Sequence, residues 1–284
     1  MGDQGQRGDG SGPRDRDLEL RPSVPLVSRK GIPADIGLTI WVAGCLGTTL
    51  VFAFQGYYPS LIGPLSNFFS PAFATILFLS ALTTFRRYGI GLKTKFQAVW
   101  ALFTFGAALW IAAETTWSVY YFVLNVSVPF PSLADVFYMG GYFPIAAGLL
   151  LYIRTFYTRP SNSRLATTLV LVVGAILLAF GGVVPLELSK NEAFVGVLVD
   201  LTYPILDITL FSITVFALAI FAGARVGGWW RMFGFGAALY VVGDENFLYQ
   251  VAAGTYYNGN YNDLIFLLAY LTFAYAFYLH RKEL

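Results

Sequence analysis

Charged side chains are scarce in this sequence: they make up 12% of its 284 residues, against about 25% in a typical soluble domain. Hydrophobic residues make up 57%, and the mean hydropathy is +0.63. So little polar surface cannot cover a folded core in water, whereas lipid can face the surplus apolar surface. The composition therefore excludes an ordinary soluble domain and favours an integral membrane protein.

Cysteine and histidine are nearly absent, with one residue of each. Cys45 can form no internal disulfide. A haem held by two histidines and a Ser-His-Asp triad are both excluded within the membrane, because His280 lies at the end of the last apolar run. No lysine lies in the interior of an apolar run, so a retinal Schiff base is excluded too. We expect no cofactor, no metal site and no catalytic residue, and the net charge of +2 gives no case for nucleic-acid binding.

The first 34 residues differ from the rest. They are rich in Gly, Pro, Arg and Asp and contain no aromatic residue. Such a composition buries too little apolar area to offset the entropy lost on ordering. The sequence therefore predicts a disordered cytoplasmic tail over residues 1–34 and a transmembrane domain over residues 35–284.

Eight apolar runs are long enough to cross about 30 Å of hydrocarbon. They cover residues 35–55, 67–85, 97–124, 134–157, 165–186, 194–223, 231–251 and 262–280. Turn-forming residues separate them. The predicted fold class is an all-α, polytopic transmembrane bundle of eight helices.

The positions of Lys and Arg predict the orientation of this bundle. If the N-terminus is cytoplasmic, only Lys190 of the 18 basic residues falls in an extracytoplasmic loop. This distribution satisfies the positive-inside rule, and one helix more or fewer would destroy it. Both ends of the chain are therefore predicted to be cytoplasmic, in a multi-pass protein of the cell membrane.

Several acidic residues lie within or at the ends of the predicted helices. An Asp at the middle of a bilayer costs about 2.5–3.5 kcal/mol on insertion scales, so acids there usually serve a function. No basic residue lies in a helix interior to neutralise them. The deepest are Glu114, Asp207 and Asp244, and Asp200 shares a predicted helix with Asp207.

Aromatic residues share helix faces with these acids. Trp110, Glu114, Trp117 and Tyr121 follow one helical face at spacings of four, three and four residues. Tyr203 shares a face with Asp200 and Asp207, and Tyr240 shares one with Asp244. If these faces converge, they form an acidic, aromatic-walled cavity that opens to the extracytoplasmic side and binds a ligand or a proton.

Simpler roles remain open for the same residues. Asp135, with Tyr138 and Tyr142 on its face, and Asp263 lie where helices begin, and acids there stabilise the helix end. Tyr and Trp are enriched at membrane interfaces in any case. Glu114, Asp207 and Asp244 could serve only as hydrogen-bonding groups between helices.

Three segments resemble the multi-pass N-terminal membrane region found ahead of diguanylate cyclase (GGDEF), EAL and histidine-kinase domains in bacterial signalling proteins. They are PSLADVFYMGGYFP, TYPILD and the stretch VVGDENFLYQVAAGTYYNGNYND. The matching positions are Pro131, Ser132, Ala134, Asp135, Tyr138, Tyr142, Pro144, Tyr203, Pro204, Asp207, Asp244, Gly254, Tyr256, Gly259 and Asp263. No output domain follows residue 280 in this sequence, so the resemblance implies a sensory or scaffold role without cyclase or kinase activity.

Together these features predict a sensor-like membrane module that responds to an external signal and passes it to a cytoplasmic signalling partner. A proton- or cation-coupled transporter is the alternative, because carriers also use intramembrane acids and proline-interrupted helices. An intramembrane enzyme acting on lipid-linked substrates ranks lowest. The sequence leaves the ligand and the oligomeric state open.

Overall fold

The chain folds into helices joined by short turns, and its described part contains no strand. This computed structural model describes residues 1–2, 35–189 and 194–284. The predicted all-α fold class is therefore confirmed. The predicted tail lies outside the described residues except for Met1 and Gly2, and residues 36–284 form one compact unit.

Eight long helical segments within the described residues correspond to the eight apolar runs. The elements are α1 (Ile36–Ala53), α2 (Pro59–Arg87), α3 (Lys95–Val119), α4 (Leu133–Phe156), α5 (Asn162–Leu178), α6 (Val184–Ser189), α7 (Phe194–Phe221), α8 (Gly227–Ala252) and α9 (Tyr261–Glu283). A π-helical turn over Tyr120–Leu124 extends α3, and another over Ala179–Val183 joins α5 to α6. A 3-10 turn over Gln55–Tyr57 precedes α2.

The start of α2 differs most from the prediction, which placed it at residue 67. The helix begins at Pro59, because proline is well suited to a first turn whose N–H groups have no partner, and it continues through Pro64 and Pro71. Pro71 has no N–H to donate to the carbonyl of Asn67, four residues earlier. That carbonyl instead accepts a hydrogen bond of 2.7 Å from Ser118 Oγ on α3.

Seven of these segments are long and apolar enough to cross a membrane, as expected of a multi-pass membrane protein. The exception is α8. Its 26 residues cover about 39 Å, but Arg231, Asp244, Glu245 and several glycines and tyrosines reduce its apolar character. The described structure thus supports seven of the eight predicted spans by length and composition.

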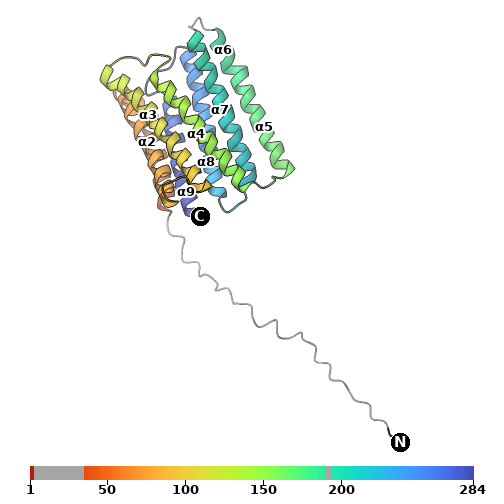
Figure 1. Ribbon diagram of the computed structural model, residues 1–284. Helices are drawn as coiled ribbons and strands as arrows, with labels where there is room; N and C mark the ends of the chain where they lie inside the picture. Colours follow the sequence, from red (N-terminus) through yellow and green to blue (C-terminus); the bar gives the residue numbers. More distant parts are fainter. Residues whose placement is uncertain (3–34, 190–193) are drawn as a thin grey trace. The chain divides into compact units, whose positions relative to one another are not determined.

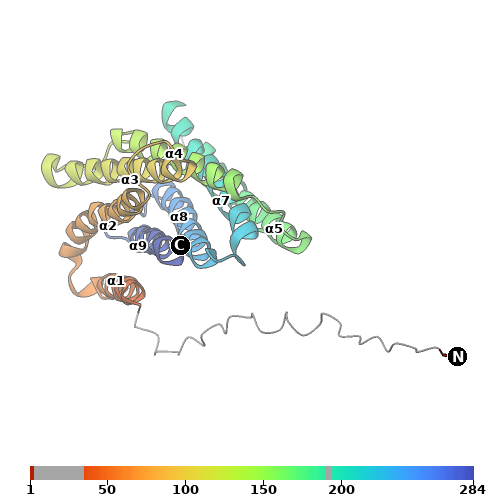
Figure 2. The ribbon, with the colours of Figure 1, turned by 60° about the horizontal axis from the view of Figure 1, so that its bottom comes forward.

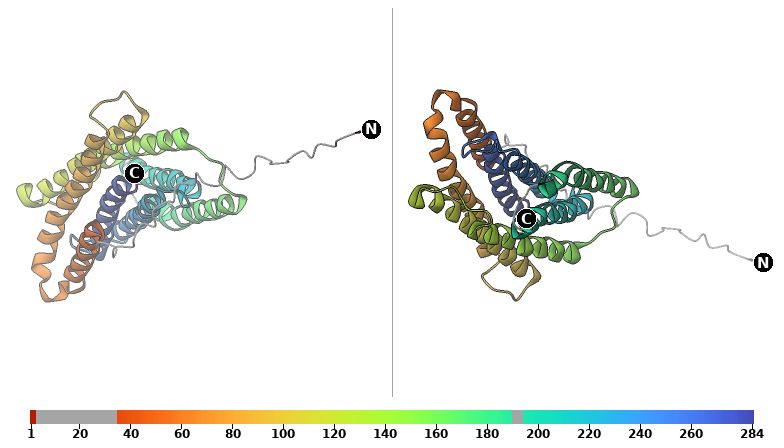
Figure 3. Two further views of the ribbon diagram at one scale, coloured as in Figure 1. Left: turned by 90° about the horizontal axis from the view of Figure 1, so that it is seen from below. Right: turned by 90° about the horizontal axis from the view of Figure 1, so that it is seen from above.

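Six helices form a closed ring around the core. In order around it, α2 packs against α3, α3 against α4, α4 against α7, α7 against α8, α8 against α9, and α9 against α2. Outside the ring, α1 packs on α9 and α5 packs on α7 (Figures 1, 2 and 3). These outer helices expose apolar side chains such as Leu46 and Leu177, as lipid contact requires.

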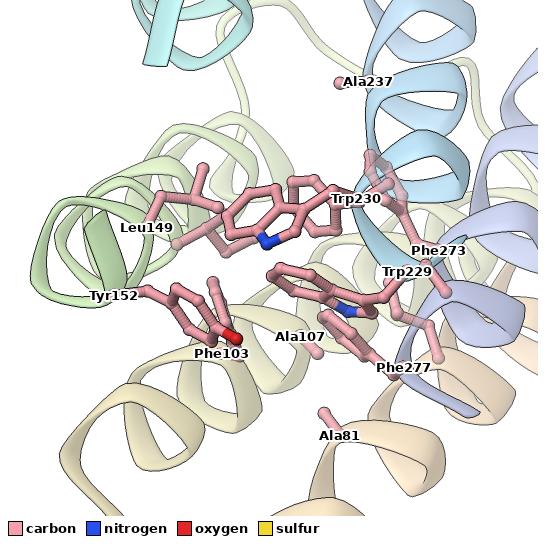
Figure 4. Packing of buried hydrophobic residues seen from close by; sticks show 14 of the residues in the cluster. Ala81, Phe103, Ala107, Leu149, Tyr152, Trp229, Trp230, Ala237, Phe273 and Phe277 are labelled. Carbon is pink, nitrogen blue, oxygen red and sulfur yellow. The ribbon is translucent and has the colours of Figure 1, made fainter. Parts of the chain in front are cut away.

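The half of the ring nearest the C-terminus is filled by aromatic side chains. Phe103, Tyr152, Trp229 and Phe277 gather between the helices in Figure 4, and all are at most 3% exposed. His280 is also fully buried there, with its ring centroid 4.7 Å from that of Trp100. This half is a tightly packed apolar core.

Close approach of α3 and α4 depends on glycine. A Cβ atom at Gly106 would lie 2.5 Å from Cγ1 of Ile145, and one at Gly141 would lie 2.5 Å from Nε1 of Trp110. Neither position has room for a side chain. The two glycines therefore fix how near Trp110 comes to α4.

Candidate functional site

The other half of the ring encloses a cavity of about 90 Å³. All six ring helices contribute to its 18 lining residues, together with Phe130 from the loop before α4 and Tyr256 and Asn258 from the loop before α9. Nine of these residues are aromatic, four are acidic and none is basic. The acidic residues are Glu114, Asp135, Asp244 and Asp263.

Asp135 lines the cavity from the first turn of α4. Its carboxylate accepts hydrogen bonds from the backbone N–H and the hydroxyl of Ser132, at 2.6 and 2.9 Å. The N-cap is Ser132 itself, and Asp135 is the third residue of the helix, so together they form a capping box. The hydroxyl of Tyr203 donates to the other carboxylate oxygen at 2.8 Å and joins α7 to α4.

Asp263 has the same position in α9, three residues after the N-cap Asn260. Its carboxylate accepts from the N–H of Gly259 at 2.7 Å, the hydroxyl of Ser66 at 2.6 Å and the hydroxyl of Tyr256 at 3.0 Å. Burial, together with the charge of Asp263, raises the pKa of Tyr256 well above its usual value, so this loop phenol remains a donor. Asp135 and Asp263 thus both stabilise helix starts while facing the cavity.

Glu114 lies deeper and belongs to no helix end. Its Oε1 accepts a hydrogen bond of 2.6 Å from the hydroxyl of Tyr270, which joins α3 to α9 across the ring. Glu114 is 7% exposed, and what remains exposed faces the cavity. Its contact with Tyr270 is therefore a link between helices and part of the cavity wall.

Asp207 and Asp244 come together through a tyrosine. The hydroxyl of Tyr142 lies 2.5 Å from Oδ1 of Asp207 and 2.8 Å from Oδ2 of Asp244. The three side chains come from α4, α7 and α8. Asp244 lines the cavity, whereas Asp207 is 1% exposed and lies behind it.

Trp110 separates the cavity from the apolar core. Its ring stacks on that of Tyr240 with centroids 4.9 Å apart and planes 9° apart. Its Nε1 donates to the carbonyl oxygen of Tyr138 at 3.3 Å. Because Tyr240 and Tyr138 line the cavity while Trp110 does not, Trp110 supports the wall from behind.

Some of the remaining residues predicted from the sequence line the cavity, and others do not. Trp117, Tyr138 and Tyr203 line the cavity, whereas Asp200 is buried outside it. Tyr121 does not line it either, because it lies in the π-helical turn that ends α3 and packs on Phe122 instead.

Sequence reasoning missed the contribution of α9 to the wall and the hydrogen bonds across its mouth. Asp263, Phe266 and Tyr270 share one face of α9 by their spacing, a signal readable in the sequence. Nothing in the sequence indicated Asn258, whose Oδ1 accepts from Trp117 Nε1 and from Asn67 Nδ2, both at 3.2 Å. These bonds fix the loop before α9 to α2 and α3.

The described residues contain no group of three or more His, Cys, Asp or Glu placed to hold a metal ion. Comparison of the chain with protein-family models, curated proteins and solved structures found no match. The resemblance to membrane regions of bacterial signalling proteins thus stays a prediction, and any function has to be argued from the cavity.

Proposed function

We propose that this chain is a sensor-like module of the cell membrane that binds a small extracytoplasmic ligand in its cavity and passes the binding event to a cytoplasmic partner. The observation that carries the proposal is the construction of the cavity. This one cavity is lined by side chains from all six ring helices, so a ligand in it would lie between all the helices that form the core.

An eight-span topology with both ends cytoplasmic fits this geometry. Although α8 is less apolar than the other segments, it lies in the ring between α7 and α9, both long and apolar enough to span. A helix shielded by others does not need an apolar surface on every side. Counting α8 as a span keeps 17 of the 18 basic residues cytoplasmic, all except Lys190.

With that topology the cavity opens outward. Phe130, Tyr256 and Asn258 belong to the loops before α4 and α9, and the orientation makes both loops extracytoplasmic. The aromatic core closes the opposite half of the ring. A ligand would therefore enter from outside and would not pass through to the cytoplasm in this conformation.

Transmission requires that the ligand prefer one arrangement of the helices. Side chains pack continuously from the cavity wall to the aromatic core. Trp110 contacts Tyr240 in the wall and Phe273 in the core, with ring centroids 4.9 and 6.1 Å away. The resemblance to membrane regions of signalling proteins supports the same interpretation.

Filling the cavity tests this function without knowledge of the ligand. Ser70 lines the cavity from α2, and Ser70→Phe would occupy part of it. Ile76→Phe on the same helix is the control, since Ile76 is 45% exposed and lies outside the cavity. Spin labels at Leu92→Cys and Ala224→Cys, with Cys45→Ala, report the distance between two loops predicted to be cytoplasmic.

If the protein is a sensor, Ser70→Phe should change the distribution of distances between the two spin labels, and Ile76→Phe should leave it unchanged. Identical distributions in both variants and the parent, with the Ser70→Phe protein folded, would contradict transmission from the cavity to the cytoplasmic face.

A proton- or cation-coupled transporter is the second candidate, and the Tyr142-linked pair of Asp207 and Asp244 favours it, since carriers use buried acids to move protons. Proteoliposomes with an entrapped pH indicator distinguish the two. Substrate-dependent proton flux that is lost in Asp207→Asn supports transport, and its absence supports sensing.

A further inference from the structure

We propose that the cavity binds a small organic monocation, such as a protonated primary amine or a quaternary ammonium ion, and that the carboxylate of Asp244 is its counter-ion. This inference rests on the proposed ligand-binding function and assigns the chemical class of the ligand. It follows from four observations: the charge of the wall, the hydrogen count at Tyr142, the aromatic surface and the volume.

The described residues of the wall include acids and no base, but two of these acids have their hydrogen-bonding capacity largely used. Asp135 and Asp263 each accept three hydrogen bonds, including a backbone N–H at a helix start. Such bonds and the helix dipole stabilise a carboxylate without any ligand. The acids left to balance a positive ligand are Glu114 and Asp244.

Asp244 differs from Glu114 because its hydrogen-bonding partner, the hydroxyl of Tyr142, is shared with Asp207. A phenol has one hydrogen to donate, yet Tyr142 Oη lies within hydrogen-bond distance of both Asp207 and Asp244. If Tyr142 donates to one carboxylate, the other contact is favourable only when that carboxyl donates a proton to Tyr142. The pair therefore holds one carboxyl proton and one negative charge, and no basic residue among the described lining neutralises that charge.

Only one member of this pair reaches the cavity. Asp244 lines it, while Asp207 is 1% exposed and its Oδ2 receives no hydrogen bond within the described structure. A cation in the cavity can therefore pair with Asp244 directly. Because a charge is least costly where it can be solvated, the proton of the pair belongs on the more deeply buried Asp207 and the negative charge on Asp244. The cation neutralises that charge, and the proton stays on Asp207.

Within the described part of the chain, every titratable side chain around this pair is an acid or a phenol, so none of them competes with a cation. They come from α3, α4, α7, α8 and α9. They are Glu114, Asp135, Tyr138, Asp200, Tyr203, Tyr240, Glu245, Asp263 and Tyr270.

The aromatic surface and the volume favour an organic cation over a metal ion. Tyr240 lies one turn from Asp244, and Phe247, Phe266 and Tyr270 complete a wall whose ring faces attract cations. Among the described residues, no three His, Cys, Asp or Glu side chains are placed to hold a metal ion. A volume of about 90 Å³ exceeds the roughly 10–15 Å³ that one water molecule needs, so a group of several atoms fits.

Isothermal titration of the purified full chain in nanodiscs tests the proposal with tetramethylammonium as the probe. Titrations in two buffers of different ionisation enthalpy count the protons released. The expected result is binding that weakens as the pH falls, because protonation of Asp244 removes the counter-ion, and that releases no proton once Asp244 is ionised. Asp244→Asn should weaken binding at least tenfold, because it removes the counter-ion.

Glu245→Gln is the matched control. Glu245 neighbours Asp244 in sequence and is 5% exposed, but it does not line the cavity, so its variant should bind like the parent. An equal loss in both variants would overturn the role of Asp244.

A neutral probe of the same shape, neopentane, separates this inference from the proposed function. If neopentane binds as well as tetramethylammonium and Ser70→Phe abolishes both, the cavity binds ligands but the cation class is wrong. If neither probe binds, or tetramethylammonium binds equally well at every pH, the inference is overturned. If tetramethylammonium binds and Ser70→Phe leaves its binding intact, the binding site lies outside the cavity and the inference also fails.

Discussion

Removing the hydroxyl of Tyr142 should destabilise the protein more than any other Tyr→Phe change in α4. The hydroxyl contacts two buried carboxyl groups on two other helices, so Tyr142→Phe leaves Asp207 and Asp244 without their shared partner. Interhelical hydrogen bonds in membranes average about 0.6 kcal/mol and reach about 1.7. Leaving a buried polar group unsatisfied costs about 1–3 kcal/mol.

We therefore expect a loss of about 1–3 kcal/mol from Tyr142→Phe. At about 2–4 °C per kcal/mol for a chain of this size, this is a fall of several degrees in Tm. The assay is thermal unfolding of purified protein in one detergent, followed by intrinsic fluorescence or by exposure of Cys45 to a thiol-reactive dye.

Tyr152→Phe provides the control on the same helix. Tyr152 is 3% exposed, and its hydroxyl makes no hydrogen bond within the described part of the chain, so its loss should change Tm by no more than about 1 °C. A double variant, Tyr142→Phe with Asp207→Asn, should lose less than the sum of the two single variants, because the contacts are shared. Equal Tm values for Tyr142→Phe and Tyr152→Phe would refute the reasoning.

Two further changes test the packing and the helix starts in the same thermal assay. Gly141→Ala should cost about 1–3 kcal/mol because its Cβ would meet Trp110 at 2.5 Å, whereas Gly174→Ala on α5, with no atom within 4 Å, should be neutral or stabilising. Equal effects would argue against close α3–α4 packing. Asp263→Asn should cost about 1–3 kcal/mol, since an amide nitrogen replaces an oxygen that accepts from Tyr256 or from Ser66 and Gly259; an unchanged Tm would dismiss these bonds.

Most of the helices were predictable from the length of the apolar runs, because a span needs about 20 apolar residues and its ends carry recognisable turn residues. The start of α2 was not predictable, because its first turns contain three prolines and such a segment is usually a loop. A proline leaves the carbonyl four residues earlier without its helical hydrogen bond, and the sequence does not show what replaces it. The hydrogen bond from Ser118 to Asn67 is such a partner, and it comes from another helix.

The site was readable one helix at a time. Spacing placed Glu114 with Trp117 and Tyr240 with Asp244, and these residues do line one cavity. The sequence could not tell which helices are neighbours in the ring, because their apolar residues cover every face. The link from Tyr142 to Asp207 and Asp244 joins three helices and is therefore visible only in the structure.

The proposed outward opening of the cavity can be tested by labelling single cysteines in intact cells with a membrane-impermeant thiol reagent. Cys45→Ala removes the only native thiol. Tyr257→Cys lies in the loop beside the cavity-lining Tyr256 and Asn258, and Leu92→Cys lies in the loop between α2 and α3; the two native side chains are 51% and 74% exposed. An outward-opening cavity requires labelling of Tyr257→Cys in intact cells and of Leu92→Cys only after permeabilisation. The opposite pattern, or labelling of both in intact cells, would show that this orientation is wrong.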